Sequence, residues 1–269
     1  MKFLPIVTLL ALAALLSFAA CQKTVHLNLD TAPTQLVING NVTDLGGPYT
    51  VTLSQSLSYY STDTAPSVSG AKVAISDITA ATTDTLSETS PGTYQTHTIQ
   101  GVSGHVYGLY VNVAGKVYTA TSTMPAKVAL DSISFYVTSF GKNQDIQPIP
   151  NFQDPPGLGN GYQFVLYVNN KQLPKTFVFS DRLSDGRYIH EPLQTDTSDL
   201  HAFDQLTIDM YCVDPVVYNY FYEVVEITDP GQQSQNAAPG NPTTNIQGGA
   251  LGVFSAHTVS VKTTDVPKQ

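Results

Sequence analysis

The stretch that decides the fold is Tyr107–Ala120, with the sequence YGLYVNVAGKVYTA. Apolar and polar residues alternate in two runs, Tyr107–Val113 and Lys116–Ala120, as they do in strands that bury one face. Between the runs lie Ala114 and Gly115, and a tight hairpin turn needs the positive φ that glycine adopts without strain. The stretch therefore predicts a β-hairpin.

Shorter runs of the same kind precede this hairpin, each bounded by glycine, proline or asparagine. They predict strands at residues 35–39, 49–53, 71–75 and 93–96. About seven strands in ~95 residues are typical of an immunoglobulin-like or transthyretin-like sandwich. We assign that sandwich to residues 34–125 and place a domain boundary after Pro125.

Residues 126–269 are also expected to be rich in β-structure. Alternating runs predict strands at 131–137, 162–168 and 257–262, and the segment between the first two is rich in Pro, Asn and Gly and predicts a loop that ends near Asn160. The expected fold class is all-β, with two β-rich domains. The second domain is expected to be a β-sandwich or a barrel-like domain with one helix.

That helix is predicted near residues 215–228. Asp214 is a suitable N-cap, and Pro215 suits the first turn because its missing N–H has no partner there anyway. Val217, Phe221 and Val224 recur at helical spacing and form one apolar face. The sequence Asp-Pro-Gly at 229–231 predicts the end of the helix.

The composition excludes one class of partner. The chain has 269 residues, 12 Lys and Arg against 21 Asp and Glu, and a formal net charge of −9. It contains no cluster of basic residues that would neutralise phosphates. We therefore expect no nucleic-acid partner.

Residues 1–20 have the pattern of a secretory signal peptide, with Lys2, an apolar run and small residues at the end. Cys21 follows directly, and Phe18-Ala19-Ala20-Cys21 resembles a bacterial lipobox, although Phe18 stands where leucine is commonest. We expect Cys21 to carry lipid, including palmitate, and residues 21–33 to form a lipidated tether. A cleaved signal that releases a soluble protein and an uncleaved anchor are the alternatives. Gln22 after the cysteine favours the outer membrane, on its periplasmic or outer face.

Several motifs resemble those of a Bacteroidota outer-membrane lipoprotein family of unknown function, domain of unknown function 4249. The motifs are LVINGNVTD at 36–44, VSGAKVAISD at 68–77, PGTYQT at 91–96, GKVYTATSTMP at 115–125 and NPTTNIQGGALGVFSAH at 241–257. The last is the most specific. Members of that family are often found beside TonB-dependent receptors. The resemblance implies an envelope protein with a possible role as a transport accessory, and it brings no catalytic residue.

The sequence contains no pattern typical of an enzyme or a metal site. The six histidines lack the spacing of zinc ligands, and Gly101–Gly104 lacks the spacing of a hydrolase nucleophile. Asp181, Asp185, Asp196 and Asp199 lie close together in loops, but turn formation explains them better than calcium binding does. We expect no catalytic residue, no metal and no cofactor.

Two kinds of surface feature remain. Tyr59 and Tyr60 in a polar loop, and the helix tyrosines 218, 220 and 222, are candidates for contact with a partner, with packing between domains as the alternative. Asp63-Thr64-Ala65 matches the Bacteroidota O-glycosylation pattern of Asp, Ser or Thr and a small residue. Thr64 is therefore a candidate O-glycosylation site.

These observations lead to one leading expectation and one alternative. We expect a lipid-anchored, non-enzymatic binding or accessory component of a TonB-dependent transporter, with a small molecule or glycan among its conceivable ligands. The alternative is an envelope hydrolase of glycan or peptide that uses Asp carboxylates in loops.

Overall fold

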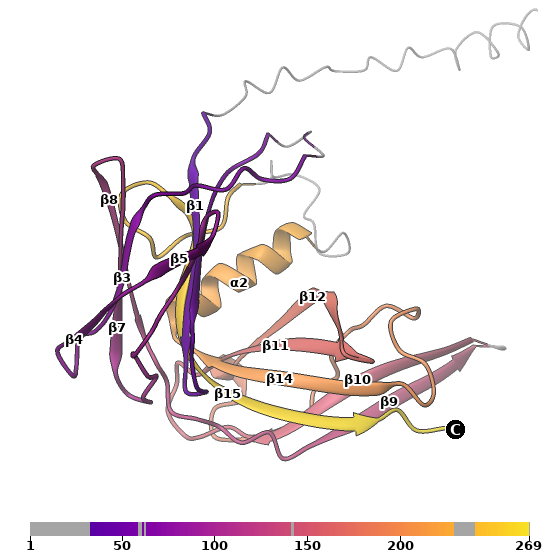
Figure 1. The fold of residues 1–269 in the computed structure, drawn as a ribbon. Helices are drawn as coiled ribbons and strands as arrows, with labels where there is room; N and C mark the ends of the chain where they lie inside the picture. The colour runs from indigo at the N-terminus through magenta and orange to yellow at the C-terminus, as the bar shows by residue number, and fades with distance from the viewer. Residues whose placement is uncertain (1–32, 59–60, 62, 141–142, 229–239, 269) are drawn as a thin grey trace, which may run out of the picture. The chain divides into compact units, whose positions relative to one another are not determined.

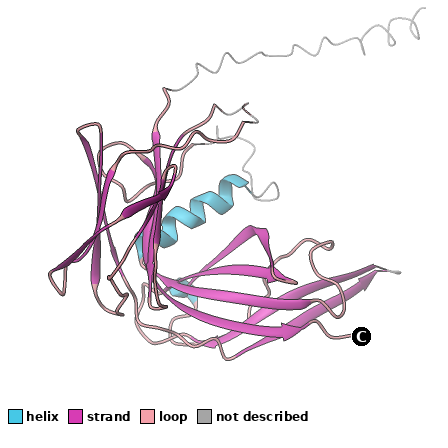
Figure 2. Ribbon diagram, in the orientation of Figure 1, coloured by secondary structure: helices cyan, strands magenta, loops and turns pink. Residues whose placement is uncertain are grey.

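The computed structural model of the chain describes residues 33–58, 61, 63–140, 143–228 and 240–268. Within these residues the fold is mostly β, as Figure 2 shows, with one α-helix and one short 3₁₀-helix. The sandwich-like, all-β class expected from the sequence is confirmed. In the part described, no helix has the length and apolar character needed to cross a membrane.

Eight strands precede residue 125. They are β1 (Leu36–Thr43), β2 (Thr50–Gln55), β3 (Lys72–Asp77), β4 (Thr82–Thr85), β5 (Ser87–Ser90), β6 (Thr93–Gln95), β7 (Val106–Val113) and β8 (Lys116–Thr123). The predicted hairpin is β7 and β8, and Ala114 and Gly115 both adopt a positive φ, at 48° and 89°.

The later elements are longer. They are β9 (Ser132–Phe140), β10 (Asn143–Gln153), β11 (Gly161–Val168), β12 (Lys171–Ser180), the 3₁₀-helix η1 (Asp181–Leu183), β13 (Tyr188–Ile189), β14 (Gln205–Val213), α2 (Pro215–Thr228) and β15 (Leu251–Asp265). The expected helix is therefore present at the predicted residues.

One sheet runs through both halves of the sequence. Its eight strands lie in the order β12-β11-β14-β15-β1-β2-β6-β5, and a four-stranded sheet, β4-β3-β7-β8, and a three-stranded sheet, β13-β10-β9, complete the fold. The long strand β15 connects the halves, because Leu251–His257 pair in parallel with β1 and Thr258–Asp265 continue the antiparallel pairing with β14 (Figure 1).

Two main hydrophobic cores form on this framework. The first contains Tyr94, Tyr107 and other buried residues of β1–β8, together with Ile246, Ala250 and Phe254 from the C-terminal segment. The second lies between the sheet of β11, β12 and β14 and the strands β9 and β10. Since the first core includes residues from both halves, the sandwich does not close with residues 34–125 alone. The boundaries 34–125 and 126–269 stay a prediction.

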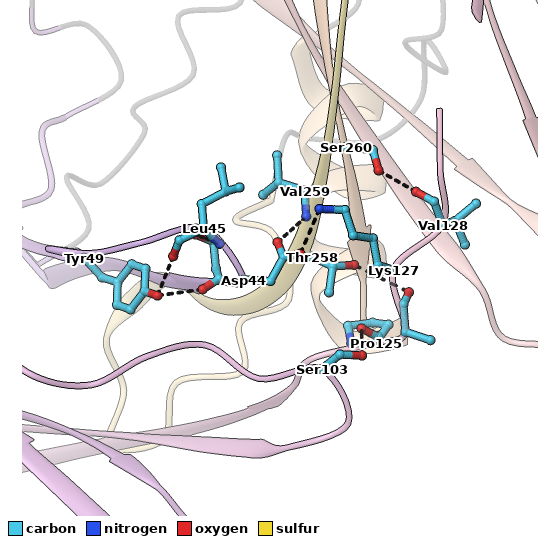
Figure 3. A network of polar contacts seen from close by, with 12 residues as sticks. Asp44, Leu45, Tyr49, Ser103, Pro125, Lys127, Val128, Thr258, Val259 and Ser260 are labelled. Carbon is cyan, nitrogen blue, oxygen red and sulfur yellow. Dashed lines mark hydrogen bonds and ion pairs between the residues drawn. The ribbon is translucent and has the colours of Figure 1, made fainter. Parts of the chain in front are cut away.

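A polar network joins the link between the halves to β15 (Figure 3). Asp44 accepts a hydrogen bond from the backbone N–H of Val259 at 2.7 Å and pairs with the Lys127 ammonium at 3.0 Å. Ser260 donates its hydroxyl to the carbonyl of Val128 at 2.6 Å. Asp44 follows β1, and Lys127 and Val128 follow β8, so the network holds the segments after both strands against β15.

The N-terminus of α2 is a second joint. Asp214 caps the helix, since one carboxylate oxygen accepts the N–H groups of Val216 and Val217 at 3.1 and 2.9 Å. The other oxygen accepts the Ser122 hydroxyl at 2.6 Å and the Thr123 N–H at 3.0 Å, both from the end of β8. The capping role predicted for Asp214 is confirmed, and the same carboxylate also ties the helix to the first half.

The segment before Asn160 differs from the expectation. Residues 143–153 form β10 rather than a loop, although Pro148 and Pro150 lie within the strand. Proline lacks an N–H and is tolerated only at a strand edge that makes no ladder. The two prolines are two residues apart, so both place the missing N–H on the same edge, and the ladder with β9 on the other edge remains complete.

The motif at residues 241–257 has a structural role in folding the C-terminal segment back on itself. Asn245 exchanges hydrogen bonds with Phe254, donating to its carbonyl at 2.7 Å and accepting from its N–H at 3.0 Å. Gly252 has a φ of +97°, and a Cβ there would lie 2.0 Å from the Ile38 carbonyl oxygen of β1. This glycine lets β15 approach β1 closely.

Candidate functional site

The site stands at the edge of the eight-stranded sheet, where two adjoining cavities of about 940 and 240 Å³ form a groove beside β12. The larger volume lies in the usual range for ligand pockets, roughly 300–1,000 Å³. Both cavities are lined by Phe179, Ile189, Glu191, Tyr218 and Tyr222. We call this continuous space the β12 groove.

Its position relative to the strand follows from the lining residues. All five consecutive residues Lys175–Phe179 line the smaller cavity. Consecutive side chains of a strand point to opposite faces, so a cavity on one face would be lined by alternate residues only. The groove therefore includes the edge of β12, and it also reaches Phe164 of β11 and Phe152 of β10, which line the same cavity.

Two segments form its walls. One wall is the side of α2 that carries Tyr218 and Tyr222, whose rings stack one helical turn apart with centroids separated by 6.1 Å. The other is residues 188–194, which begin with β13 and are held by its pairing with β10 and by the bond from the Leu193 N–H to the Pro148 carbonyl. Tyr222 is 46% exposed, so an aromatic face is available to a ligand.

A loop at residues 157–161 closes one end, and carboxylates fix it. Asp181 accepts the N–H groups of Gly159 and Asn160 at 3.2 and 2.9 Å, and Asp185 accepts that of Gly157 at 2.7 Å. Asp154 is fully buried and accepts the Tyr162 hydroxyl and the Gly186 N–H. Burial, followed by the bond to Asp154, raises the pKa of Tyr162, so this phenol stays protonated.

The same three aspartates place carboxylate oxygens within 4.8 Å of one another, a distance at which a cation could be held. Each of them already accepts at least one hydrogen bond, however, so the local role that the geometry shows is to fix the loop. The structure thus brings Asp181 and Asp185 together, as the sequence suggested. Asp196 and Asp199 instead form a separate turn, in which the Asp196 N–H donates to Asp199 at 3.0 Å.

Charge is unevenly distributed along the groove. The chain contains only two arginines, Arg182 and Arg187, and both line the larger cavity. Both are exposed, and neither forms an ion pair with any residue that the structure describes. Asp181 also lines the larger cavity, Glu191 lines both, and Glu226 and Lys175 line the smaller one. Both guanidinium groups of a chain of net charge −9 therefore lie along the same cavity.

The residues selected from the sequence fall elsewhere or outside the described ranges. Cys21, Tyr59 and Tyr60 lie outside the described residues. Thr64 is exposed in the loop between β2 and β3. Of the helix tyrosines, Tyr218 and Tyr222 line the groove, whereas Tyr220 packs on the helix-facing side of the sheet. Tyr218 packs against the same cluster as Tyr220, and contact of these tyrosines with a partner stays a prediction.

The remaining titratable groups have structural roles. His97, His105 and His201 lie beside Asp84, Asp77 and Asp204, each in a one-to-one pair. His257 is buried against Tyr211, and burial lowers its pKa to about 4 although Asp44 acts in the opposite direction. Cys212 is buried, and burial raises the pKa of its thiol, so it behaves as a core residue.

Sequence reasoning did not find the groove as a unit. Its residues come from five parts of the chain, 150–152, 158–161, Phe164, 175–194 and 215–226, which only the fold brings together. The rarity of arginine, with both residues five positions apart, was the available indication.

The chain was also compared with known proteins. No curated protein matches it. A family model described as a domain of unknown function, DUF4249, matches residues 22–263, which include α2 and every strand except the last two residues of β15. The chain therefore belongs to the DUF4249 family.

Proposed function

We propose that the protein is a lipid-anchored, non-enzymatic binding component of the outer membrane that associates with a TonB-dependent transporter. The observation that carries the binding role is the β12 groove, with an exposed aromatic wall and two arginines that have no ion-pair partner among the described residues. Such a role needs no catalytic group. A shaped surface with a few polar groups is sufficient.

The anchor is the part of the proposal that rests on sequence alone. Cys21 follows an apolar segment and small residues, which is the arrangement that lipid attachment requires. In the Cys21→Ser variant we expect no lipid labelling and recovery in the soluble fraction, whereas the parent chain fractionates with the outer membrane. A labelled, membrane-bound Cys21→Ser protein would contradict the anchor.

An envelope hydrolase is the alternative. Such chemistry needs carboxylates that are free to exchange protons with a substrate. At the groove, Asp154, Asp181 and Asp185 are engaged by backbone N–H groups or by Tyr162, which supports a structural role for them. Burial raises the pKa of Asp209, but this residue lies on β14 outside the groove lining, beside Tyr211. We therefore place binding before hydrolysis.

The transporter association can be tested by site-specific photo-crosslinking in intact cells. A photoreactive residue is placed at Leu183 or Tyr222, which are 85% and 46% exposed and line the groove, and at Val117 on β8, which is 43% exposed, as a matched control. We expect an adduct with a TonB-dependent receptor from the groove positions and none from Val117. Groove positions that give no receptor adduct, under conditions that capture known receptor–lipoprotein pairs, would refute the association.

Two further surface proposals follow from the sequence. Tyr59 and Tyr60 are proposed as a second partner contact, and the same photoreactive residue at either position tests it. Thr64 is proposed as an O-glycosylation site, and its exposure is compatible with modification. An intact mass of the native protein equal to polypeptide plus lipid, unchanged by Thr64→Ala, would remove this second proposal.

A further inference from the structure

The outer edge of β12 has unused backbone hydrogen-bonding groups. The Asp181 N–H donates to the Asn160 carbonyl at 3.2 Å, just beyond the last pair of the ladder between β12 and β11. Residues of an antiparallel strand alternate between bonding one neighbour and the other. Counting back from Asp181, Phe179 and Phe177 bond β11, so the N–H and C=O groups of Ser180, Val178 and Thr176 point into the groove.

These outward groups have no hydrogen-bond partner in the described part of the chain. A strand edge of this kind is a ready template for another strand, and proteins usually block it with lysine or proline. In β12 such residues stand only in the first half, at Lys171, Pro174 and Lys175. The second half, residues 176–180, contains neither a charge nor a proline, and it lies in the groove together with Lys175.

The walls make this edge accessible to an extended chain while limiting what else can reach it. Tyr218 and Tyr222 stand on one side, and residues 188–194 stand on the other. Strand addition to a sheet edge uses backbone bonds for affinity and side pockets for specificity. The groove offers three residues with outward backbone groups, spaced two apart as one added strand requires.

Charge indicates the composition of the occupant. Arg182 and Arg187 lie just beyond the open edge, at the end where β12 finishes, and a guanidinium group binds a carboxylate in a bidentate geometry. The nearby Asp181 and Asp185 direct oxygens to backbone N–H groups of the loop instead. The arginines are thus available to acidic side chains from outside the chain.

We propose that the β12 groove binds an extended acidic segment of a partner protein, which adds a strand to residues Thr176–Ser180 and places acidic side chains on Arg182 and Arg187. This inference rests on the proposed binding role and specifies how the site would work. It predicts that recognition depends on the backbone of β12 as much as on the side chains around it.

The test uses the full chain, held in detergent solution, and a displayed library of random ten-residue peptides. We expect selected peptides to alternate apolar and polar residues and to carry Asp or Glu at one end. Hydrogen exchange of residues 176–180 should slow when a selected peptide binds, because added backbone bonds protect amides. No enrichment over a protein-free control, or no change in exchange at these residues, would overturn the proposal.

Two pairs of variants separate backbone from side-chain effects. Val178→Pro removes one outward N–H without breaking the ladder with β11, so we expect affinity to fall about tenfold, whereas Val178→Ala keeps the N–H and should retain most of the affinity. Arg182→Glu with Arg187→Glu should lower affinity about tenfold or more for acidic peptides, and peptides with Lys in place of the acid should recover it. Equal binding by all variants would contradict strand addition.

The remaining outcomes are also decisive. Binding that is lost when the peptide C-terminus is amidated would assign the arginines to a terminal carboxylate and overturn the role of acidic side chains. Concentration-dependent dimers that disappear in Val178→Pro would identify a second copy of this chain as the occupant instead. Peptide binding without a receptor adduct in cells would refute the transporter association alone, and a receptor adduct without peptide binding would refute strand addition alone.

Discussion

The most informative perturbation is Asp214→Ala, because one carboxylate joins three elements. It caps α2 through the N–H groups of Val216 and Val217, and it accepts bonds from Ser122 and Thr123 at the end of β8. The Ser122 hydroxyl oxygen in turn accepts the N–H of Ala256 in β15 at 2.9 Å. Removing the carboxylate therefore disturbs the helix, the four-stranded sheet and the shared strand together.

The magnitude follows from these contacts. Loss of an N-cap costs about 0.5–2 kcal/mol of unfolding free energy. A buried donor left without its acceptor costs about 1–3 kcal/mol, and Ser122 and Thr123 both lose theirs. Allowing for partial relaxation, we expect Asp214→Ala to lower the free energy of unfolding by about 3–5 kcal/mol, at the upper end for a single substitution. Asp214→Asn keeps one capping oxygen and should cost about half as much.

The assay is urea denaturation of the full chain in the Cys21→Ser background, followed by fluorescence of the tyrosines. Asp63→Ala is the matched control, since Asp63 is exposed and, among the residues described, its side chain bonds only to Ser61. It should change stability by less than about 0.5 kcal/mol. A double-mutant cycle with Ser122→Ala should give a coupling of about 1 kcal/mol or more. A loss below about 1 kcal/mol in Asp214→Ala, or additive effects in the cycle, would refute this account of the joint.

Three further predictions concern the same framework. Gly252→Ala should destabilise the protein by about 3 kcal/mol or more in urea denaturation, because its φ is +97° and a Cβ would meet the Ile38 carbonyl at 2.0 Å; a Gly249→Ala variant, with positive φ but open space, should cost less. Burial lowers the pKa of His257 to about 4, below its value of about 6.5 in an unfolded chain. Its contribution to stability is therefore complete above pH 6.5 and falls as pH drops from about 6.5 to about 4. The free energy of unfolding, plotted against pH across that window, should change less in His257→Gln than in wild type, and equal slopes would contradict this. Burial acts to raise the pKa of Asp84, but bonds from the N–H groups of Thr98, Ile99 and His97 lower it to about 2. Wild type should therefore lose this residue's contribution to stability as pH falls from about 4 through about 2, and Asp84→Asn should not. Acid titration followed by circular dichroism measures the difference.

Local chemistry predicted some elements well. The helix 215–228 was predictable because Asp214 and Pro215 define its start, and its apolar residues recur at helical spacing. The β7–β8 hairpin was predictable because alternation on both sides of Ala114-Gly115 is a short-range pattern. In both cases every interaction that sets the element lies within a few residues along the chain.

Long-range features were not predictable in the same way. Nothing local indicates that β15 pairs in parallel with β1, more than two hundred residues away. Pro148 and Pro150 suggested a loop, because proline cannot donate a backbone hydrogen bond within a sheet. Only the assembled sheet shows that their missing N–H groups lie on the edge of β10 that does not pair with β9. The β12 groove likewise depends on α2 and residues 188–194 meeting beside a strand edge, and no single segment contains it.

The position of β1 has a mechanical consequence. The proposed tether, residues 21–33, precedes β1 in the sequence, and β1 is paired with β15 on one side and with β2 on the other. If a force at the N-terminal end of β1 acts along the strand axis, the seven paired positions of the parallel ladder with β15 have to shear at once rather than separate one at a time. Because β15 is shared by both halves and is paired with β14 as well, the load would pass from β1 to the whole eight-stranded sheet.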